Sequence, residues 1–181
     1  GGRAPEEEQM EMFEHLDDSL RSASYQAYEI SNYAIPGHES RHNMIYWTNQ
    51  AYWGLGLSAH SYFPEVENGL RFWNSRSLSE YQRQVSLPAL ESILDPLLPS
   101  QFELLNENEA LTDFCHMHLR TRQGLSINAA RNRCPENLKS RLFEGFDRLQ
   151  NQGLLETHQE FVRLTSKGFR LSNQAFLELT F

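Results

Sequence analysis

The sequence has only two cysteines, Cys115 and Cys134, and it has no long apolar run. Two thiols cannot build a disulfide framework or a cysteine-rich metal site, so we expect both to be reduced. No stretch approaches the roughly 18 apolar residues of a transmembrane helix, and no basic-then-apolar leader opens the chain. We therefore expect a cytoplasmic protein with no integral membrane segment.

Positive charge is also scarce. The chain has 16 lysines and arginines against 24 aspartates and glutamates, a formal net charge of −8. The average field would therefore repel a phosphate backbone. The apolar fraction of 39% and the charged fraction of 22% are ordinary for a globular protein, and 181 residues suffice for one good core or two small ones.

The first half of the chain reads as alternating helix and extended segments. Residues 5–23 have helical apolar spacing after Pro5 and an acidic triplet, and residues 25–31 alternate as a short strand. We expect a loop through the Pro36-Gly37 region, a buried strand over residues 51–63 and a third over 70–75. Ser77 and Glu80 have the spacing of a capping box for a helix that follows.

The second half has the order helix, helix, helix, hairpin, which is typical of a winged helix. A strong helix precedes Gly124, Ser126 caps a short second helix, and Pro135 opens a third that ends at Gly153. Strand, turn and strand follow over residues 154–165, then a closing helix. Residues 135–181 hold six basic and six acidic side chains, so 6 − 6 = 0 and no basic recognition face is expected. A nucleic-acid-binding module is thus a weak third hypothesis, and we expect no nucleic-acid partner.

We divide the chain at these changes of pattern. Residues 1–9 are expected to be a disordered end or a cloning remnant, and residues 10–87 form the first domain. Residues 88–104 form a proline-containing connector, and residues 105–181 form the second domain. The fold class expected is α+β.

Residues 40–63, "SRHNMIYWTNQAYWGLGLSAHSYF", combine aromatic rings, histidines and a Gly-x-Gly. Gly54 and Gly56 would lie on one face of a strand, where bare backbone admits either a neighbouring element or a flat ligand. His42 beside Tyr46 and Trp47 suits a planar macrocycle, because rings stack on its faces while an imidazole can ligate iron. Without further information, these residues are explained more simply by a histidine bonded to a backbone carbonyl, with the aromatic rings filling a core.

A resemblance extends these observations. The series "YEISNYAIPGHESRHNMIYW", "YWGLGLSAHSYF" and "RFWN" resembles the radical SAM family around anaerobic coproporphyrinogen III oxidase, and "HNMIYW" is similar to its HemW-type haem chaperone branch. "GLSINAARNR", "RLQNQGLLE" and "VRLTSKGFRLSNQAFLEL" resemble the C-terminal domain of the same family. The resemblance implies the last α/β units of a partial (β/α) barrel, followed by a helical, winged-helix-like domain.

The resemblance also implies a site. It makes haem or another porphyrin the ligand and His42 the haem-iron ligand, with S-adenosylmethionine (SAM) facing the last barrel strand. The expected haem-binding residues are His42, Asn43, Tyr46 and Trp47, and the expected SAM-facing residues are Gly54, Gly56, Ser58 and Ala59.

The three-cysteine motif of the family is missing from this sequence. Three thiolates hold the [4Fe–4S] cluster that binds SAM, so the cluster and SAM belong to a full-length parent. We expect the chain to be the C-terminal portion of a haem chaperone that passes haem to an acceptor protein, or alternatively of a coproporphyrinogen III oxidase. An open barrel edge would favour self-association.

Overall fold

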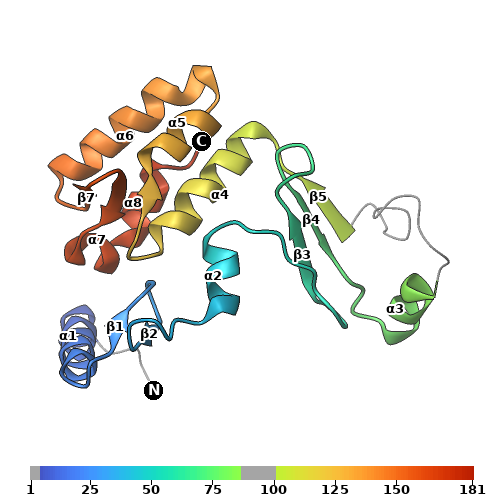
Figure 1. Cartoon of the computed structure of the whole chain (residues 1–181), viewed down its shortest axis with the longest axis horizontal. Helices are drawn as coiled ribbons and strands as arrows, with labels where there is room; N and C mark the ends of the chain where they lie inside the picture. Colours follow the sequence, from blue (N-terminus) through green and yellow to red (C-terminus); the bar gives the residue numbers. More distant parts are fainter. Residues whose placement is uncertain (1–4, 87–100) are drawn as a thin grey trace.

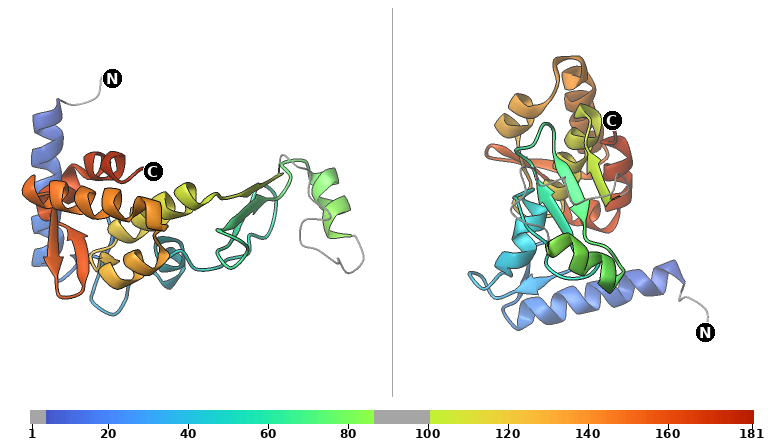
Figure 2. Two further views of the ribbon diagram at one scale, coloured as in Figure 1. Left: turned by 90° about the horizontal axis from the view of Figure 1, so that it is seen from above. Right: turned by 90° about the vertical axis from the view of Figure 1, so that its right-hand side faces the viewer.

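A computed structural model describes residues 5–86 and 101–181. Figure 1 shows a C-terminal group of helices and short strands on one side and a separate sheet with a helix on the other. The first helix and a small hairpin lie beneath the C-terminal group. The left view of Figure 2 shows that the chain is extended, with the sheet of β3, His60–Phe63, and β4, Leu70–Trp73, well away from the first helix.

The N-terminal segment forms one helix and one very short hairpin. Helix α1 covers Glu6–Ser22, as the helical spacing predicted. Residues 6–9 thus belong to this helix, whereas an irregular end was expected over residues 1–9, of which 1–4 lie outside the described residues. The strand expected over 25–31 is reduced to β1, Gln26–Ala27, which pairs antiparallel with β2, Tyr33–Ala34. Both strands are too short to produce a detectable alternation.

The loop expected over residues 32–43 is wrong at its end, because residues 41–43 belong to helix α2, Arg41–Trp47. The Ser40 side chain caps it by accepting a hydrogen bond from the Asn43 backbone N–H. A capping serine directly before an irregular apolar pattern is enough to start a short helix, even though seven residues show no clear periodicity.

The expected strand over residues 51–63 is wrong in its middle. Only β3, His60–Phe63, is regular, while Tyr52 forms an isolated antiparallel bridge with Tyr62. Gly56 has φ 98° and Ser58 has φ 58°, and these left-handed conformations cannot continue a strand. Residues 54–59 therefore form the turn of a hairpin instead of an extended face.

Strands β3, β4 and β5 form an antiparallel sheet in that order. Strand β4, Leu70–Trp73, confirms the third predicted strand, and β5, Phe102–Leu104, pairs with it. Residues 102–104 were expected in the connector, whose residues 88–100 lie outside the described residues.

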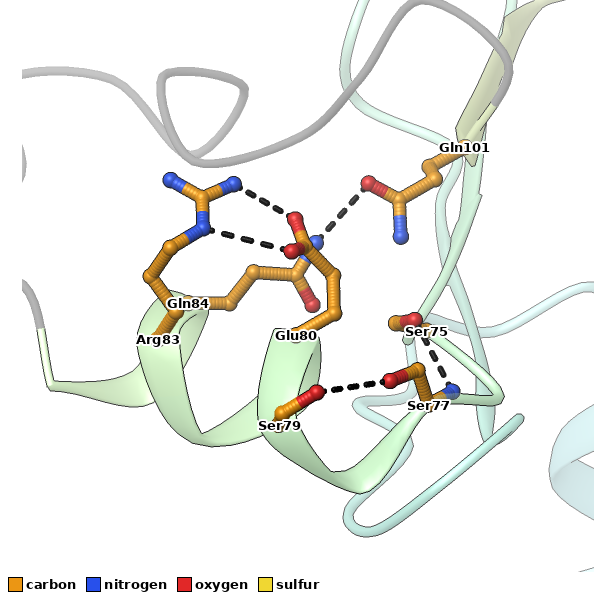
Figure 3. A network of polar contacts seen from close by, with 7 residues as sticks. All are labelled: Ser75, Ser77, Ser79, Glu80, Arg83, Gln84 and Gln101. Atoms are coloured by element: carbon orange, nitrogen blue, oxygen red, sulfur yellow. Dashed lines mark hydrogen bonds and ion pairs between the residues drawn. The ribbon is translucent and has the colours of Figure 1, made fainter.

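Helix α3, Leu78–Val85, confirms the helix predicted after Ser77, but the predicted capping box is wrong. Figure 3 shows why: the Ser77 hydroxyl bonds Ser79 Oγ, and Glu80 turns toward Arg83 instead of the helix start. The Glu80 carboxylate forms a charge-assisted hydrogen bond with Arg83, which is stronger than a bond to a neutral backbone N–H at the start of the helix.

The C-terminal half contains the principal core. Leu142, Leu149, Leu154 and Leu164 are almost fully buried there, together with aromatic side chains of neighbouring helices. The helices predicted from spacing are confirmed, and the closing helix is divided into two. The elements are α4, Glu107–Leu119; β6, Leu125–Ser126; α5, Ile127–Arg133; η2, Glu136–Leu138; α6, Lys139–Asn151; β7, Leu155–His158; β8, Phe161–Leu164; α7, Ser166–Arg170; and α8, Ser172–Glu178.

The sheets do not by themselves form part of a parallel barrel. Among the described residues every strand pair is antiparallel, with order β6-β8-β7 in the C-terminal sheet. A (β/α) barrel is built from parallel neighbouring strands. The described residues therefore establish a fold of mixed α and β elements but do not establish the expected partial barrel. Across the described residues, no helix is both long and apolar enough to cross a membrane.

Candidate functional site

Helix α2 carries the residues on which the sequence prediction centred. His42 and Tyr46 are four residues apart and therefore lie on one side of the helix, one turn from each other. The His42 side chain is exposed, and its Nε2 lies 2.9 Å from the Tyr46 hydroxyl oxygen. The two rings meet edge to face with centroids 5.0 Å apart. The imidazole is thus held by a phenol and exposed to solvent, and no backbone carbonyl of the described residues bonds it.

The Tyr46 ring begins a row of tyrosines that continues into the hairpin. Its centroid lies 4.6 Å from that of Tyr52, which lies 6.3 Å from that of Tyr62. Tyr52 and Tyr62 exchange two backbone hydrogen bonds of 2.9 Å each. Burial raises the pKa of Tyr52, and the nearby Tyr46 adds to that increase. We call His42, Tyr46, Tyr52 and Tyr62 the aromatic row.

Trp47 lies against the C-terminal half and not beside His42. The guanidinium carbon of Arg120 is 5.4 Å from the Trp47 ring centroid and 4.8 Å from that of Phe176. Arg120 thus lies between α2 and α8. The Asn43 side-chain amide donates a 3.2 Å hydrogen bond to the Tyr28 hydroxyl, which ties α2 to the N-terminal hairpin.

Tyr46 and Trp47 both line a small cavity of about 150 Å³ between α2, the hairpin and α4. Its wall includes the Arg71–Asp113 ion pair and Trp47, whose buried Nε1–H finds no hydrogen-bond partner within residues 5–86 and 101–181. Sites for drug-sized ligands usually measure roughly 300–1,000 Å³. This cavity is therefore too small for a porphyrin.

The backbone of the Gly-x-Gly is already bonded within the chain. Gly54 N–H donates to Ser61 Oγ, Gly56 N–H donates to the Tyr81 hydroxyl, and both glycine carbonyls accept from the Asn74 amide. A Cβ on Gly54 would lie 2.2 Å from the His60 carbonyl oxygen. Gly54 thus serves close packing between chain segments, one of the two roles that its spacing left open.

Ser58 and Ala59 complete the same turn. The Ser58 backbone N–H donates to the Ser75 carbonyl over 3.2 Å, and the Ala59 carbonyl accepts from Asn74 N–H over 2.9 Å. The four residues expected to face SAM are therefore brought together by the structure, in a turn and not on a strand.

The cysteines do not offer a metal site. Cys115 and Cys134 are free and buried, and burial raises the pKa of both thiols. No group of three histidine, cysteine, aspartate or glutamate side chains converges within residues 5–86 and 101–181. Three thiolates hold a [4Fe–4S] cluster, and this chain has two cysteines, so its residues do not fit that cofactor.

His116 and His118 predict an acid sensitivity of the fold. Burial lowers the pKa of both imidazoles, and Arg120 and Arg133 respectively add to the effect. The unfolded chain then binds more protons below about pH 6.5, so stability falls as the pH falls toward 5. The slope is at most about 1.4 kcal/mol per pH unit for each histidine. Urea unfolding at pH 7.5 and 5.5 checks this, and the double variant His116→Gln, His118→Gln should show a smaller difference between the two pH values. An equal difference would contradict it.

Sequence reasoning missed the residues that support α2 from other elements. Tyr52 and Tyr62 could have been suspected from the density of aromatic residues in the segment. Arg120 and Phe176 carry no such signal, because the contacts of Arg120 with Trp47 and with Phe176 join positions far apart in the chain.

Comparisons with known proteins agree with this structure. The model of the HemN C-terminal domain family matches residues 105–171. The haem chaperone HemW of Lactococcus lactis is 29% identical over 171 residues, which cover 94% of this chain and 42% of that protein. HemW of Synechocystis is 36% identical over 122 residues, which cover 67% of this chain and 27% of that protein.

A solved structure, coproporphyrinogen III oxidase (HemN) from Escherichia coli, described as a radical SAM enzyme, matches with a TM-score of 0.66. The match covers 98% of this chain and 42% of that chain at 14% identity, which shows a shared fold only. The chain spans about two-fifths of the length of the first of its curated relatives. Residues 105–171 therefore belong to the HemN C-terminal domain family, and the chain as a whole is similar to the C-terminal portion of HemW haem chaperones.

Proposed function

We propose that this chain is the C-terminal portion of a HemW-type haem chaperone and that α2 presents His42 as a ligand for haem iron. The observation that carries the proposal is the exposed His42–Tyr46 pair, with 2.9 Å between Nε2 and the hydroxyl oxygen. An exposed imidazole held by a hydrogen bond is oriented and yet open to an incoming ligand, which suits cargo that must be picked up and released.

The two ring nitrogens would have different tasks. Where Nε2 carries the proton and donates to Tyr46, the lone pair of Nδ1 is available to iron. Where Tyr46 donates to Nε2, the iron would have to displace the hydroxyl from that nitrogen. In either case the macrocycle lies over the outer side of α2, against the Tyr46 ring, because the cavity beneath is too small.

The remaining parts of the proposal concern the parent protein. SAM and the [4Fe–4S] cluster would be held by residues outside this chain, with the turn formed by Gly54, Gly56, Ser58 and Ala59 facing the SAM site. The backbone N–H groups of Gly54 and Gly56 already donate to Ser61 and Tyr81 within the chain. Side chains of the turn would therefore make the contact with SAM. The N-terminal elements would complete a partial barrel, and residues 105–181 would act as a winged-helix-like domain that docks the haem acceptor.

A haem titration followed by the Soret band tests the ligand assignment. We expect His42→Ala to weaken haem binding at least tenfold and to shift the Soret maximum, since it removes the bond to iron. His38→Ala is the matched control, because His38 is also exposed and lies outside α2. Tyr46→Phe keeps the ring but frees the imidazole, so it should bind haem with an altered spectrum. Unchanged affinity and spectrum in His42→Ala would overturn the proposal.

A further inference from the structure

We propose that a second cleft, which α2 does not line, binds a phosphate-bearing ligand of nucleotide size. The cleft measures about 790 Å³ and lies between the end of α1 with strand β1 and the C-terminal sheet with the start of α7. Figure 1 shows α1 and β1 beside α7 on the same side of the molecule. A weak ion pair of 3.8 Å between Arg170 and Glu14 spans the same junction.

Three arginines from three elements line this cleft. Arg21 comes from the last turn of α1, Arg122 follows α4, and Arg163 lies on β8. Ser24 and Ser166 add hydroxyl groups to the same wall, whereas the Thr165 hydroxyl already donates to the Gly153 carbonyl over 2.7 Å. Guanidinium groups arranged around one cleft, with hydroxyl donors between them, match the several acceptor oxygens of a phosphate.

Two of these arginines are already paired and one is not. Arg21 bonds Asp17 over 2.9 Å, and Arg163 bonds Glu156 over 2.8 Å. Arg122 lies over the Phe169 ring at 4.0 Å, and no carboxylate of the described residues comes within ion-pair distance of it. Three cations against two carboxylates leave 3 − 2 = +1 at a cleft of a chain whose net charge is −8.

The environment of Arg122 favours binding of an anion. The side chain is partly buried, and its backbone N–H is fixed by a 3.0 Å bond to the Tyr28 carbonyl. Burial lowers the pKa of Arg122 more than any other influence, and the charges of Arg21 and Arg163 lower it further, while Asp17 and Tyr33 act in the opposite direction. A bound anion would offset both unfavourable effects.

The size and one aromatic side chain favour a nucleotide over bare phosphate. A volume of about 790 Å³ exceeds what inorganic phosphate fills and lies within the range of small-molecule sites. Tyr25 lines the cleft and is 39% exposed, so its ring offers a surface for a base. Phosphate on the arginines with a flat ring against Tyr25 therefore describes the ligand class.

Isothermal titration calorimetry of the whole chain tests the site, with ADP, inorganic pyrophosphate and citrate as probes at low salt. We expect ADP to bind more tightly than pyrophosphate, and pyrophosphate more tightly than citrate. Arg122→Gln and Arg163→Gln should each weaken ADP binding about tenfold, the usual effect of losing a charge-assisted hydrogen bond. Arg163→Gln is included because it leaves the Arg122–Phe169 contact intact.

Arg83→Gln is the matched control, since Arg83 is exposed and paired with Glu80 on α3, which lies at the opposite side of the molecule from α1 and α7 (Figure 1). It should leave ADP affinity unchanged. Absence of ADP binding by the unmodified chain, equal loss in the control, or citrate binding as tightly as pyrophosphate would each overturn the proposal. The haem titration of the same samples reports α2 separately, so failure of one site is distinguishable from failure of the other.

Discussion

Alanine at position 54 is expected to destabilise the protein by about 1–3 kcal/mol, the usual range for overpacking. The new Cβ would lie 2.2 Å from the His60 carbonyl oxygen and 2.9 Å from the Ala59 carbonyl carbon, and both are backbone atoms of the same hairpin. The hairpin must therefore open where Tyr52 and Tyr62 exchange their backbone bonds. Urea unfolding measures the loss, and amide exchange of Tyr52 and Tyr62 should become faster.

Gly37→Ala is the control for this experiment. Gly37 has φ 85° and no atom within 4 Å of a Cβ, so its substitution strains the backbone without touching the hairpin. It should lower the free energy of unfolding by roughly 1–2 kcal/mol. The amides of Tyr52 and Tyr62 should then exchange faster only to the extent that global unfolding becomes more frequent, with no additional local opening of the hairpin. If Gly54→Ala behaves in the same way, close packing is not the reason for glycine at position 54.

Long elements with a clear period could be predicted from the sequence. Leu142, Phe146 and Leu149 recur at helical spacing and are buried on α6. Ser126 was predicted to cap a short helix, and its side chain does cap α5 by accepting a hydrogen bond from the Ala129 backbone N–H. In these segments the hydrophobic period and the cap specify the same structure, so local and global preferences agree.

Short elements could not be predicted because their structure depends on distant partners. Strand β1 has two residues and exists through its pairing with β2, and β5 exists through its pairing with β4. The strand expected over residues 51–63 is interrupted at Ser58, which has a left-handed φ of 58°. A serine in the sequence does not predict such a conformation. Such conformations are fixed by the bonds around them, here from Ser58 N–H to the Ser75 carbonyl.

The residue types of the candidate site could be predicted from the sequence, but their arrangement could not. The residue types of "HNMIYW" indicated a ligand-binding segment, but His42 and Tyr46 form a pair only because the segment is a helix. With that helix the i and i+4 positions meet, while the next residue, Trp47, packs toward Arg120. The strand assumed for the glycines made the bare backbone look available, whereas Asn74 and Ser61 already bond it.

Leu142→Ala is expected to cause the largest loss of stability, about 2–5 kcal/mol, because it leaves a cavity in the core of the C-terminal half. Leu142 is fully buried on α6, with no exposed surface. Leu177→Ala is the matched control: the same side chain is removed from a helix, but Leu177 is 77% exposed. That variant should stay within about 0.5 kcal/mol of the unmodified chain. Urea unfolding followed by far-ultraviolet circular dichroism gives both values.

Tryptophan fluorescence in the same titration shows whether the two halves unfold together. All three tryptophans, Trp47, Trp53 and Trp73, lie in the first half of the chain, while the core around Leu142 lies in the second. Trp47 contacts Arg120, which in turn contacts Phe176 of that core. If this contact couples the halves, Leu142→Ala shifts the fluorescence transition as far as the dichroism transition. A fluorescence midpoint that does not move would mean that α2 keeps its structure without the C-terminal core.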